Sequence, residues 1–264
     1  MRDFYATSSP VPLDQADGLR RMFAGQRCQV LALVANPHVA FGGVVLDRVA
    51  ARLAALDREV LVVDAAASAP APHELALLDL AAGIERVADR VSYLPARGLP
   101  LRHIDTRGSA SGFVDALLGA APRASALLLH ADATDLARML VRRAARPLLL
   151  AADHPESLKH AYAGAKLLLR RTGLATFDLL LAAGARSPRI EGIARSLAQC
   201  LDSFLDALLC DVALVDPAGD PALDDDDLGR VLSGQLALGN DEPGAELVVA
   251  TALAPRPSAP RAAR

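Results

Sequence analysis

The sequence predicts one doubly wound α/β domain, in which a mostly parallel sheet carries helices on both faces. Two kinds of segment alternate along the chain: apolar runs too continuous for one-sided strands, and stretches with helical periodicity. This alternation is typical of parallel strands joined by right-handed helical crossovers. The chain has 264 residues, of which 52% are apolar, so it can bury one large core.

The predicted elements follow from these patterns. Strands are expected at 29–35, 59–64, 126–130, 147–151, 177–182 and 212–215, with a weaker one at 99–105. Helices, which place apolar residues three and four positions apart, are expected at about 44–57, 73–81, 111–119, 133–145, 156–171 and 189–208. The acidic run 224–227 indicates a further helix start, because carboxylates stabilise a helix amino terminus.

The two ends differ from this body. Residues 1–26 are predicted to form a flexible arm that carries one helix, 27–250 the α/β domain, and 251–264 a disordered tail rich in proline, alanine and arginine. The first residues lack the apolar segment of a secretory signal, and no apolar stretch reaches the roughly 18–20 residues that span a bilayer. We therefore expect a cytoplasmic protein.

Charge and cysteine content exclude several function classes. The net charge of −3 gives no general attraction to nucleic acid or anionic lipid. The apolar segment 246–253 lacks a basic face, which argues against direct membrane binding. The three cysteines show no CxxC spacing, and the histidines are scattered, so no metal site is expected. Four arginines near one predicted helix indicate a solvated face or, alternatively, a docking patch: Arg138, Arg142, Arg143 and Arg146.

The segment 14–23, with the sequence DQADGLRRMF, predicts a short helix before the first strand. Asp14 suits the N-cap and Asp17 the first turn, and an apolar stripe follows at Leu19, Met22 and Phe23. A helix of about ten residues is marginal alone in water, so it must dock on another surface. That surface is either its own domain or a partner.

This segment resembles the DQAxxLR motif of the FlhG/FleN family of flagellar-number regulators, which are MinD/ParA-like P-loop ATPases. In that family the segment docks on FlhF, a GTPase of the signal-recognition type, and stimulates GTP hydrolysis. The resemblance implies that Gln15 reaches the partner's nucleotide, where a glutamine can orient the attacking water. It implies partner contacts at Asp14, Gln15, Ala16, Leu19 and Arg20, with the apolar stripe at Met22 and Phe23.

The nucleotide-binding loop of that family is not preserved. In the family, the first strand runs into GKGGVGKT, and alignment on the second strand places Asn36-Pro37-His38-Val39-Ala40-Phe41-Gly42-Gly43 there. Pro37 and Gly42 replace the two lysines, and Gly43 replaces the hydroxyl residue that binds magnesium. A P-loop needs glycines for close backbone approach and lysine for charge. Losing three charge-assisted hydrogen bonds weakens binding by roughly 4–9 kcal/mol.

Other positions of the family's ATP site differ in the same way. Asp64 keeps the first acid after the second strand, but Ala66 stands where the family has the second, and His130 stands where the family has the Walker B acid. The adenine-contacting asparagine is replaced by Ala182 or Ala183. The resemblance resumes at 151–163, which is similar to the family's TPEPTSLTDAYA.

The resemblance implies a regulator of flagellar placement or number that stimulates an FlhF-like GTPase. It implies a monomer without ATP or magnesium and without ATPase activity of its own, recruited to the cell pole through its partner. Two alternatives remain open at this point. One is an active MinD/ParA-like ATPase with a remodelled loop. The other is a scaffold that partners a transcription activator or another polar-localisation protein, with the segment 14–23 packed on its own domain. Besides the FlhF-like GTPase, the partners that the resemblance implies are a flagellar transcription activator or a C-ring component.

Overall fold

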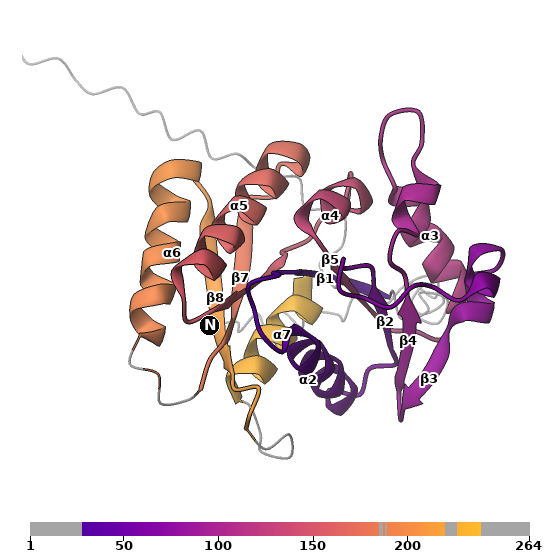
Figure 1. Cartoon of the computed structure of the whole chain (residues 1–264), viewed down its shortest axis with the longest axis horizontal. Coiled ribbons are helices and arrows are strands. Elements are labelled where there is room, and N and C mark those ends of the chain that lie inside the picture. The colour runs from indigo at the N-terminus through magenta and orange to yellow at the C-terminus, as the bar shows by residue number, and fades with distance from the viewer. Residues whose placement is uncertain (1–27, 185–186, 188, 220–225, 239–264) are drawn as a thin grey trace, which may run out of the picture.

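The computed structural model describes residues 28–184, 187, 189–219 and 226–238. Its strands form one eight-stranded sheet in the order β3-β4-β2-β5-β1-β6-β7-β8 (Figure 1). All neighbouring pairs are parallel except β3 with β4, so the predicted mostly parallel sheet is confirmed. The strands are β1 (Gln29–Val34), β2 (Val60–Asp64), β3 (Glu85–Ala88), β4 (Val91–Pro95), β5 (Ala126–Ala131), β6 (Leu148–Ala152), β7 (Thr176–Ala182) and β8 (Leu208–Val215).

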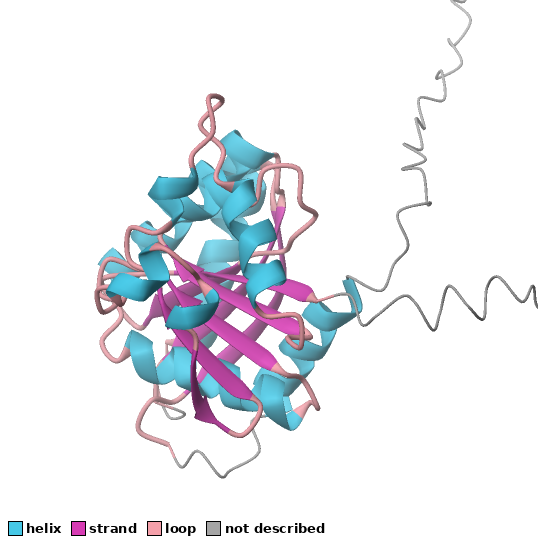
Figure 2. Cartoon of the chain, turned by 90° about the vertical axis from the view of Figure 1, so that its right-hand side faces the viewer, coloured by secondary structure: helices cyan, strands magenta, loops and turns pink. Residues whose placement is uncertain are grey.

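Helices cover both faces of the sheet, which lies between two helical layers in Figure 2. One face packs against α3 (Ser111–Ala120), α4 (Ala133–Met139), α5 (Pro155–Thr172) and α6 (Ile190–Leu205). The other face packs against α2 (Gly42–Ala55) and α7 (Asp226–Leu238). The continuous apolar runs are explained by this arrangement, because every residue of β2 and of β5 is buried. None of the helices in the described ranges is both long enough and apolar enough to cross a membrane.

Local signals explain where the helices beside the central strands begin and end. The Asp132 side chain caps α4 by accepting the Asp135 N–H, and His154 caps α5 by accepting the Ser157 N–H. Proline stands at the first position of α5, where its missing N–H has no helical partner. Gly173 ends that helix at φ 77°, a left-handed conformation that glycine adopts without strain.

Three predicted elements differ from the structure. The segment 73–81 contains two short 3₁₀ helices, η1 (Glu74–Leu77) and η2 (Ala81–Gly83), instead of one α-helix. The strand predicted at 99–105 is a 3₁₀ helix, η3 (Pro100–His103), which starts at a proline. The helix predicted over 133–145 ends at Met139 with Leu140 as its C-cap, and the left-handed φ of 61° at Arg142 keeps the chain from continuing it. The sequence patterns also missed the β3–β4 hairpin, in which every residue of β3 is exposed.

A buried polar group joins α7 to the sheet on the β7 side. Asp178 of β7 is fully buried and accepts hydrogen bonds from Arg146 Nε at 2.8 Å and from Gln235 Nε2 at 2.7 Å. Gln235 Nε2 also donates to the Arg146 carbonyl at 2.7 Å. A buried carboxylate with this set of partners fixes the position of α7 against β7.

Candidate functional site

The carboxyl edge of the sheet contains a topological switch point between β1 and β6. These strands are neighbours, but the chain leaves β1 through α2 on one face and leaves β6 through α5 on the other. In open α/β sheets, ligands bind in the crevice at such a point, outside the carboxyl ends of the strands. The predicted remnant of the P-loop, residues 36–43, follows β1 directly and therefore lies at this crevice.

Asn36 bridges the two sides of the switch point. Its side chain is 6% exposed, and Nδ2 lies 2.8 Å from the Leu150 carbonyl oxygen of β6 and 2.9 Å from that of Ser157 in α5. Nδ2 also lies 3.1 Å from Ser157 Oγ, and this hydroxyl in turn accepts the Ala152 N–H at 2.8 Å. The loop is thus tied across the crevice where a ligand would enter between β1 and β6.

The loop's own backbone amides are turned inward by the same residue. The His38 N–H donates to Asn36 Oδ1 at 3.1 Å, and the Val39 N–H donates to the Asn36 carbonyl at 3.0 Å. In a phosphate-binding loop, successive amides point at the ligand instead. Val39 is 7% exposed, and its side chain belongs to the core on the α2 face. At least two amides of this loop are therefore committed within the protein.

The end of the loop places an aromatic residue at the start of α2. Phe41 is the N-cap of α2, has a left-handed φ of 61° and is 71% exposed. A bulky residue in this conformation carries strain of about 1–2 kcal/mol. Gly42 and Gly43 form the first turn, and a Cβ on Gly43 would meet nothing within 4 Å. The helix amino terminus thus has neither a capping side chain nor a lysine.

Three histidines gather beside the loop. The ring centroid of His38 lies 6.3 Å from that of His154 and 5.6 Å from that of His160. His154 Nε2 donates to the His38 carbonyl at 2.7 Å, so α5 holds the loop from its capping residue as well. Desolvation by burial and the nearby charge of His38 lower the pKa of His160. Among the described residues, no set of three or more histidine, cysteine or acidic side chains is arranged to hold a metal ion.

Asp64 and His130 face each other across the neighbouring strands β2 and β5. The two residues are in register, and His130 Nδ1 donates to Asp64 Oδ1 at 2.8 Å, with both side chains buried. Asp64 Oδ1 also accepts the Ala66 N–H at 3.3 Å, and Oδ2 accepts the Tyr93 hydroxyl of β4 at 3.3 Å. Both carboxylate oxygens are therefore engaged by groups of the protein itself.

The electrostatics of this edge follow from the Asp64 charge. Burial and the negative charge of Asp64 raise the pKa of the Tyr93 hydroxyl, and the same two causes raise the pKa of Asp47 in α2. Both shifts favour the protonated form of an acid that lies near the Asp64 carboxylate. We define the site at the carboxyl edge, henceforth the edge site, as Asn36, His38, Phe41, Asp64, Tyr93, His130 and Ser157.

The structure brings the predicted remnants of the ATP site to one edge of the sheet. Asn36, Asp64 and His130 are buried there, whereas Pro37 and His38 are exposed on the same loop. Sequence reasoning missed Tyr93, which belongs to no motif, and it gave no role to Ser157, although Ser157 lies in the segment 151–163 that resembles the family. Both residues reach the edge through strand order and helix packing. The predicted partner-binding segment 14–23 lies outside the described residues.

Known proteins are similar to this chain in structure but not in sequence. No protein-family model matches the sequence, and no curated protein matches it. The structure is similar to the MinD cell division protein of Aquifex aeolicus, with a TM-score of 0.52 and 14% identity over 78% of this chain and 98% of that one. It is similar to a plasmid partition protein of Borrelia burgdorferi bound to AMPPNP, with a TM-score of 0.56 and 10% identity over 81% and 99%.

A third similar structure is the ATP complex of a McdA variant from Cyanothece. Its TM-score is 0.55, with 14% identity over 81% of this chain and 98% of that one. These chains are covered almost completely, so the likeness extends over the whole domain and is not limited to a shared βαβ unit. At such low identity the likeness concerns architecture. The chain has the fold of the MinD and ParA proteins.

Proposed function

We propose that this protein regulates flagellar placement or number by stimulating an FlhF-like GTPase, and that it neither binds nor hydrolyses ATP in doing so. The proposed loss of ATP binding rests on the hydrogen bonds of the Asn36 side chain. The family's loop is open to phosphate, whereas here the Asn36 side chain joins the end of β1 to β6 and α5 across the switch point. The first half rests on the resemblance of segment 14–23 to the activating motif of the FlhG/FleN family.

Loss of ATP binding is supported by what each remaining group does. Asp64 stands where the family keeps an acid, yet its carboxylate is hydrogen-bonded to His130 and Tyr93. A magnesium ion would need oxygen ligands that are free to coordinate it. No lysine occurs at positions 36–43 to neutralise phosphate charge. The protein would therefore remain a monomer, since no nucleotide is available to drive dimerisation.

The activating role is assigned to the segment before β1. Leu19, Met22 and Phe23 would dock on the partner GTPase, and Gln15 would orient the water that attacks GTP. The α/β domain that follows this segment would carry it and would remain in one state, the monomer. The chemistry would belong entirely to the partner's nucleotide site, with one glutamine supplied from this chain.

The test is GTP turnover by the cognate FlhF-like GTPase, with and without this protein. Wild type should stimulate turnover, Gln15→Ala should abolish the stimulation, and Gln26→Ala, a glutamine outside the motif, should leave it intact. Stimulation that is equal for wild type and Gln15→Ala would remove the assigned role of Gln15. Absence of stimulation with both proteins folded would favour the scaffold alternative.

An active ATPase with a remodelled loop is the second candidate. It is favoured by the similar fold of proteins whose structures contain AMPPNP or ATP. Light scattering separates the two candidates, because the proposal predicts the same monomeric mass with and without Mg-ATP. A shift to dimer on adding Mg-ATP would establish the second candidate instead.

A further inference from the structure

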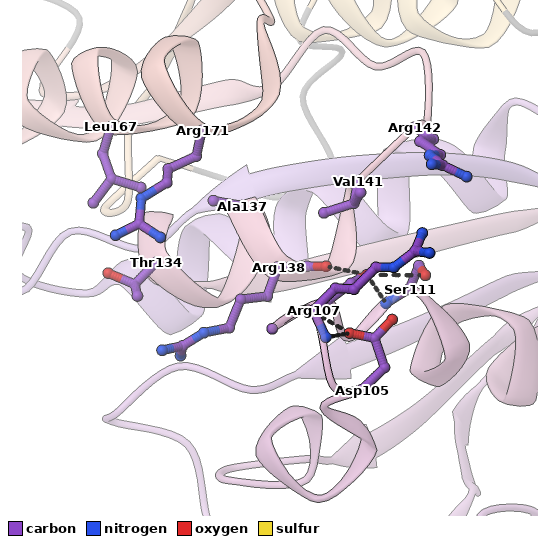
Figure 3. Close-up of a pocket in the computed structure, with 12 residues that line it drawn as sticks. Asp105, Arg107, Ser111, Thr134, Ala137, Arg138, Val141, Arg142, Leu167 and Arg171 are labelled. Carbon is purple, nitrogen blue, oxygen red and sulfur yellow. Dashed lines mark hydrogen bonds between the residues drawn. The ribbon is translucent and has the colours of Figure 1, made fainter.

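A cavity of about 340 Å³ lies away from the edge site, between the loop before α3, helix α4 with the residues after it, and the end of α5 (Figure 3). Its charged lining consists of four arginines and one aspartate, a net charge of +3 in a chain whose net charge is −3. The arginines are Arg107, Arg138, Arg142 and Arg171, and the aspartate is Asp105. Ser109, Ser111 and Thr134 add hydroxyl groups.

The structure separates the arginine cluster seen in the sequence into two groups. Arg143 pairs with Asp115 at 2.5 Å, and Arg146 pairs with buried Asp178 at 2.8 Å, so these two have structural partners. Arg138 and Arg142 instead line the cavity. Of these two, Arg142 forms no ion pair among the described residues, and Arg138 pairs with Asp135 of its own helix.

Most of the positive charge in the cavity has no counter-charge in direct contact. Arg138 pairs with Asp135 at 2.7 Å, but across the described ranges the guanidinium groups of Arg107, Arg142 and Arg171 form no ion pair. In Figure 3 the side chains of Arg138 and Arg171 extend to the side of the view on which Thr134 lies, and that of Arg107 extends to the other. The side chains of Arg107, Arg142 and Arg171 are exposed, so water and salt screen their mutual repulsion, and a bound anion would reduce it further.

The backbone around the cavity is held firmly. The Asp105 carboxylate accepts the N–H groups of Arg107 and Ser109 at 2.9 and 2.8 Å, and these hydrogen bonds lower its pKa. The Ala110 N–H donates to the Arg138 carbonyl at 3.0 Å, which ties this loop to α4. Arg142 keeps a left-handed φ of 61°, a conformation that arginine rarely adopts. The arginine side chains thus project from a fixed frame.

From this arrangement we propose that the cavity binds a small ligand that carries two or more phosphate groups. Guanidinium groups bind phosphate oxygens in pairs of parallel hydrogen bonds, and hydroxyl groups can complete the shell. The volume lies in the range of small-molecule sites and is too confined for a folded partner. The site lies on the α3–α4–α5 face and uses none of the groups of the edge site, so it is independent of the proposed function.

The probe is inorganic pyrophosphate, titrated calorimetrically into the full chain at low ionic strength. We expect saturable binding of one pyrophosphate per chain, weakened about tenfold or more by Arg171→Ala and by Arg142→Ala. Arg170→Ala is the matched control, because Arg170 precedes Arg171 in α5, is exposed and does not line the cavity. Arg171→Lys, which keeps the charge but not the paired hydrogen bonds, should be intermediate.

Two results would overturn the proposal. One is the absence of saturable binding by the folded wild type. The other is equal weakening by Arg170→Ala and Arg171→Ala, which would mean attraction to general surface charge. A parallel titration with an oligoglutamate peptide tests another occupant: binding of the peptide without binding of pyrophosphate would assign the surface to an acidic protein segment and overturn the small-ligand proposal.

Discussion

The edge site and the arginine cavity are both polar, but they differ in how their polar groups are partnered. At the edge site, Asn36 and Asp64 are hydrogen-bonded by the protein itself, and the His38 and Val39 amides donate to Asn36. In the cavity, Arg142 and Arg171 line an open volume without ion pairs in the described part of the chain. The position of the switch point in the fold favours it as the ligand site. The polar groups favour the cavity, because Arg142 and Arg171 form no ion pair among the described residues.

The difference lies in what each set of polar groups already binds within the described part of the chain. Polar groups that bond to one another inside the protein contribute to its stability, whereas solvated side chains beside an open volume are available to bind a ligand. Substitutions at the edge site should therefore alter the free energy of unfolding, and substitutions in the cavity should leave it nearly unchanged. The following predictions test this contrast, beginning with the largest expected effect.

Asn36→Ala should lower the free energy of unfolding by about 2–4 kcal/mol, because it removes the donor to Leu150 and Ser157 and leaves buried carbonyl groups with fewer partners. Urea denaturation measures the change. Gly43→Ala is the matched control at the end of the same loop. It should be neutral or stabilising by up to about 1 kcal/mol, since its Cβ would meet no atom within 4 Å. Equal stability of Asn36→Ala and wild type would contradict the structural role of Asn36.

His130→Ala should lower the free energy of unfolding by about 1–3 kcal/mol, because the buried Asp64 carboxylate loses its shortest side-chain hydrogen bond. His130→Asn should recover part of the loss, since an amide can donate to Asp64. The same urea titration provides the comparison. An alanine variant as stable as wild type would show that the Asp64–His130 hydrogen bond contributes nothing to stability.

Tyr93→Phe should change how stability depends on alkaline pH. Because the pKa of Tyr93 is raised in the folded chain, the folded state keeps the phenol proton where the unfolded state, with a pKa near 10, has lost it. The folded state then binds more protons, so the free energy of unfolding falls as pH rises above about 10. Tyr93→Phe should fall less steeply in urea titrations between pH 9 and 11.

Wild type and Tyr93→Phe share the other group whose pKa is raised in this range, so the comparison of the two contains its own control. Burial raises the pKa of the Cys28 thiol to about 11, which produces a decline of the same sign in wild type and variant alike. The difference between the two curves therefore isolates Tyr93. Parallel curves over this range would mean that neither burial nor Asp64 raises the pKa of Tyr93 in the folded chain.

Arg171→Ala should change the free energy of unfolding by no more than about 0.5 kcal/mol, because the side chain is exposed and forms no ion pair among the described residues. The substitution should instead weaken the binding of pyrophosphate. Urea denaturation at low ionic strength gives the value. A loss above about 1 kcal/mol would show that the cavity arginines serve the fold, and the contrast with the edge site would fail.

The fold was largely predictable because burial on both faces leaves a plain pattern. The run that became β5 is apolar through Leu127, Leu128 and Leu129, and nothing competes with its interpretation as a strand. The β3–β4 hairpin left no such pattern: β3 is exposed throughout, and β4 ends at Pro95. At η3, the apolar residues around Pro100 matched a strand, but the proline begins a 3₁₀ turn instead.

The edge site and the arginine cavity also differ in how far the sequence predicted them. Alignment on a family motif placed Asn36, Asp64 and His130 at one site, because each lies at or just beyond the carboxyl end of a strand. The bond between Asn36 and Ser157 was not predictable, since the two residues are separated by 121 positions and meet only through helix packing. The cavity was hidden for the same reason, because Arg107, Arg138 and Arg171 come from three separate segments.

The most direct test of the account is a calorimetric titration of Mg-ATP into the variant that carries both Arg142→Ala and Arg171→Ala. Removing the cavity arginines leaves the edge site as the place where ATP would bind in this fold. We expect no saturable binding below about 1 mM, since the His38 and Val39 amides are bonded within the protein and the loop after β1 has no lysine. Micromolar binding that persists in this variant would show that the nucleotide site still functions, and the account of a filled switch point would be wrong.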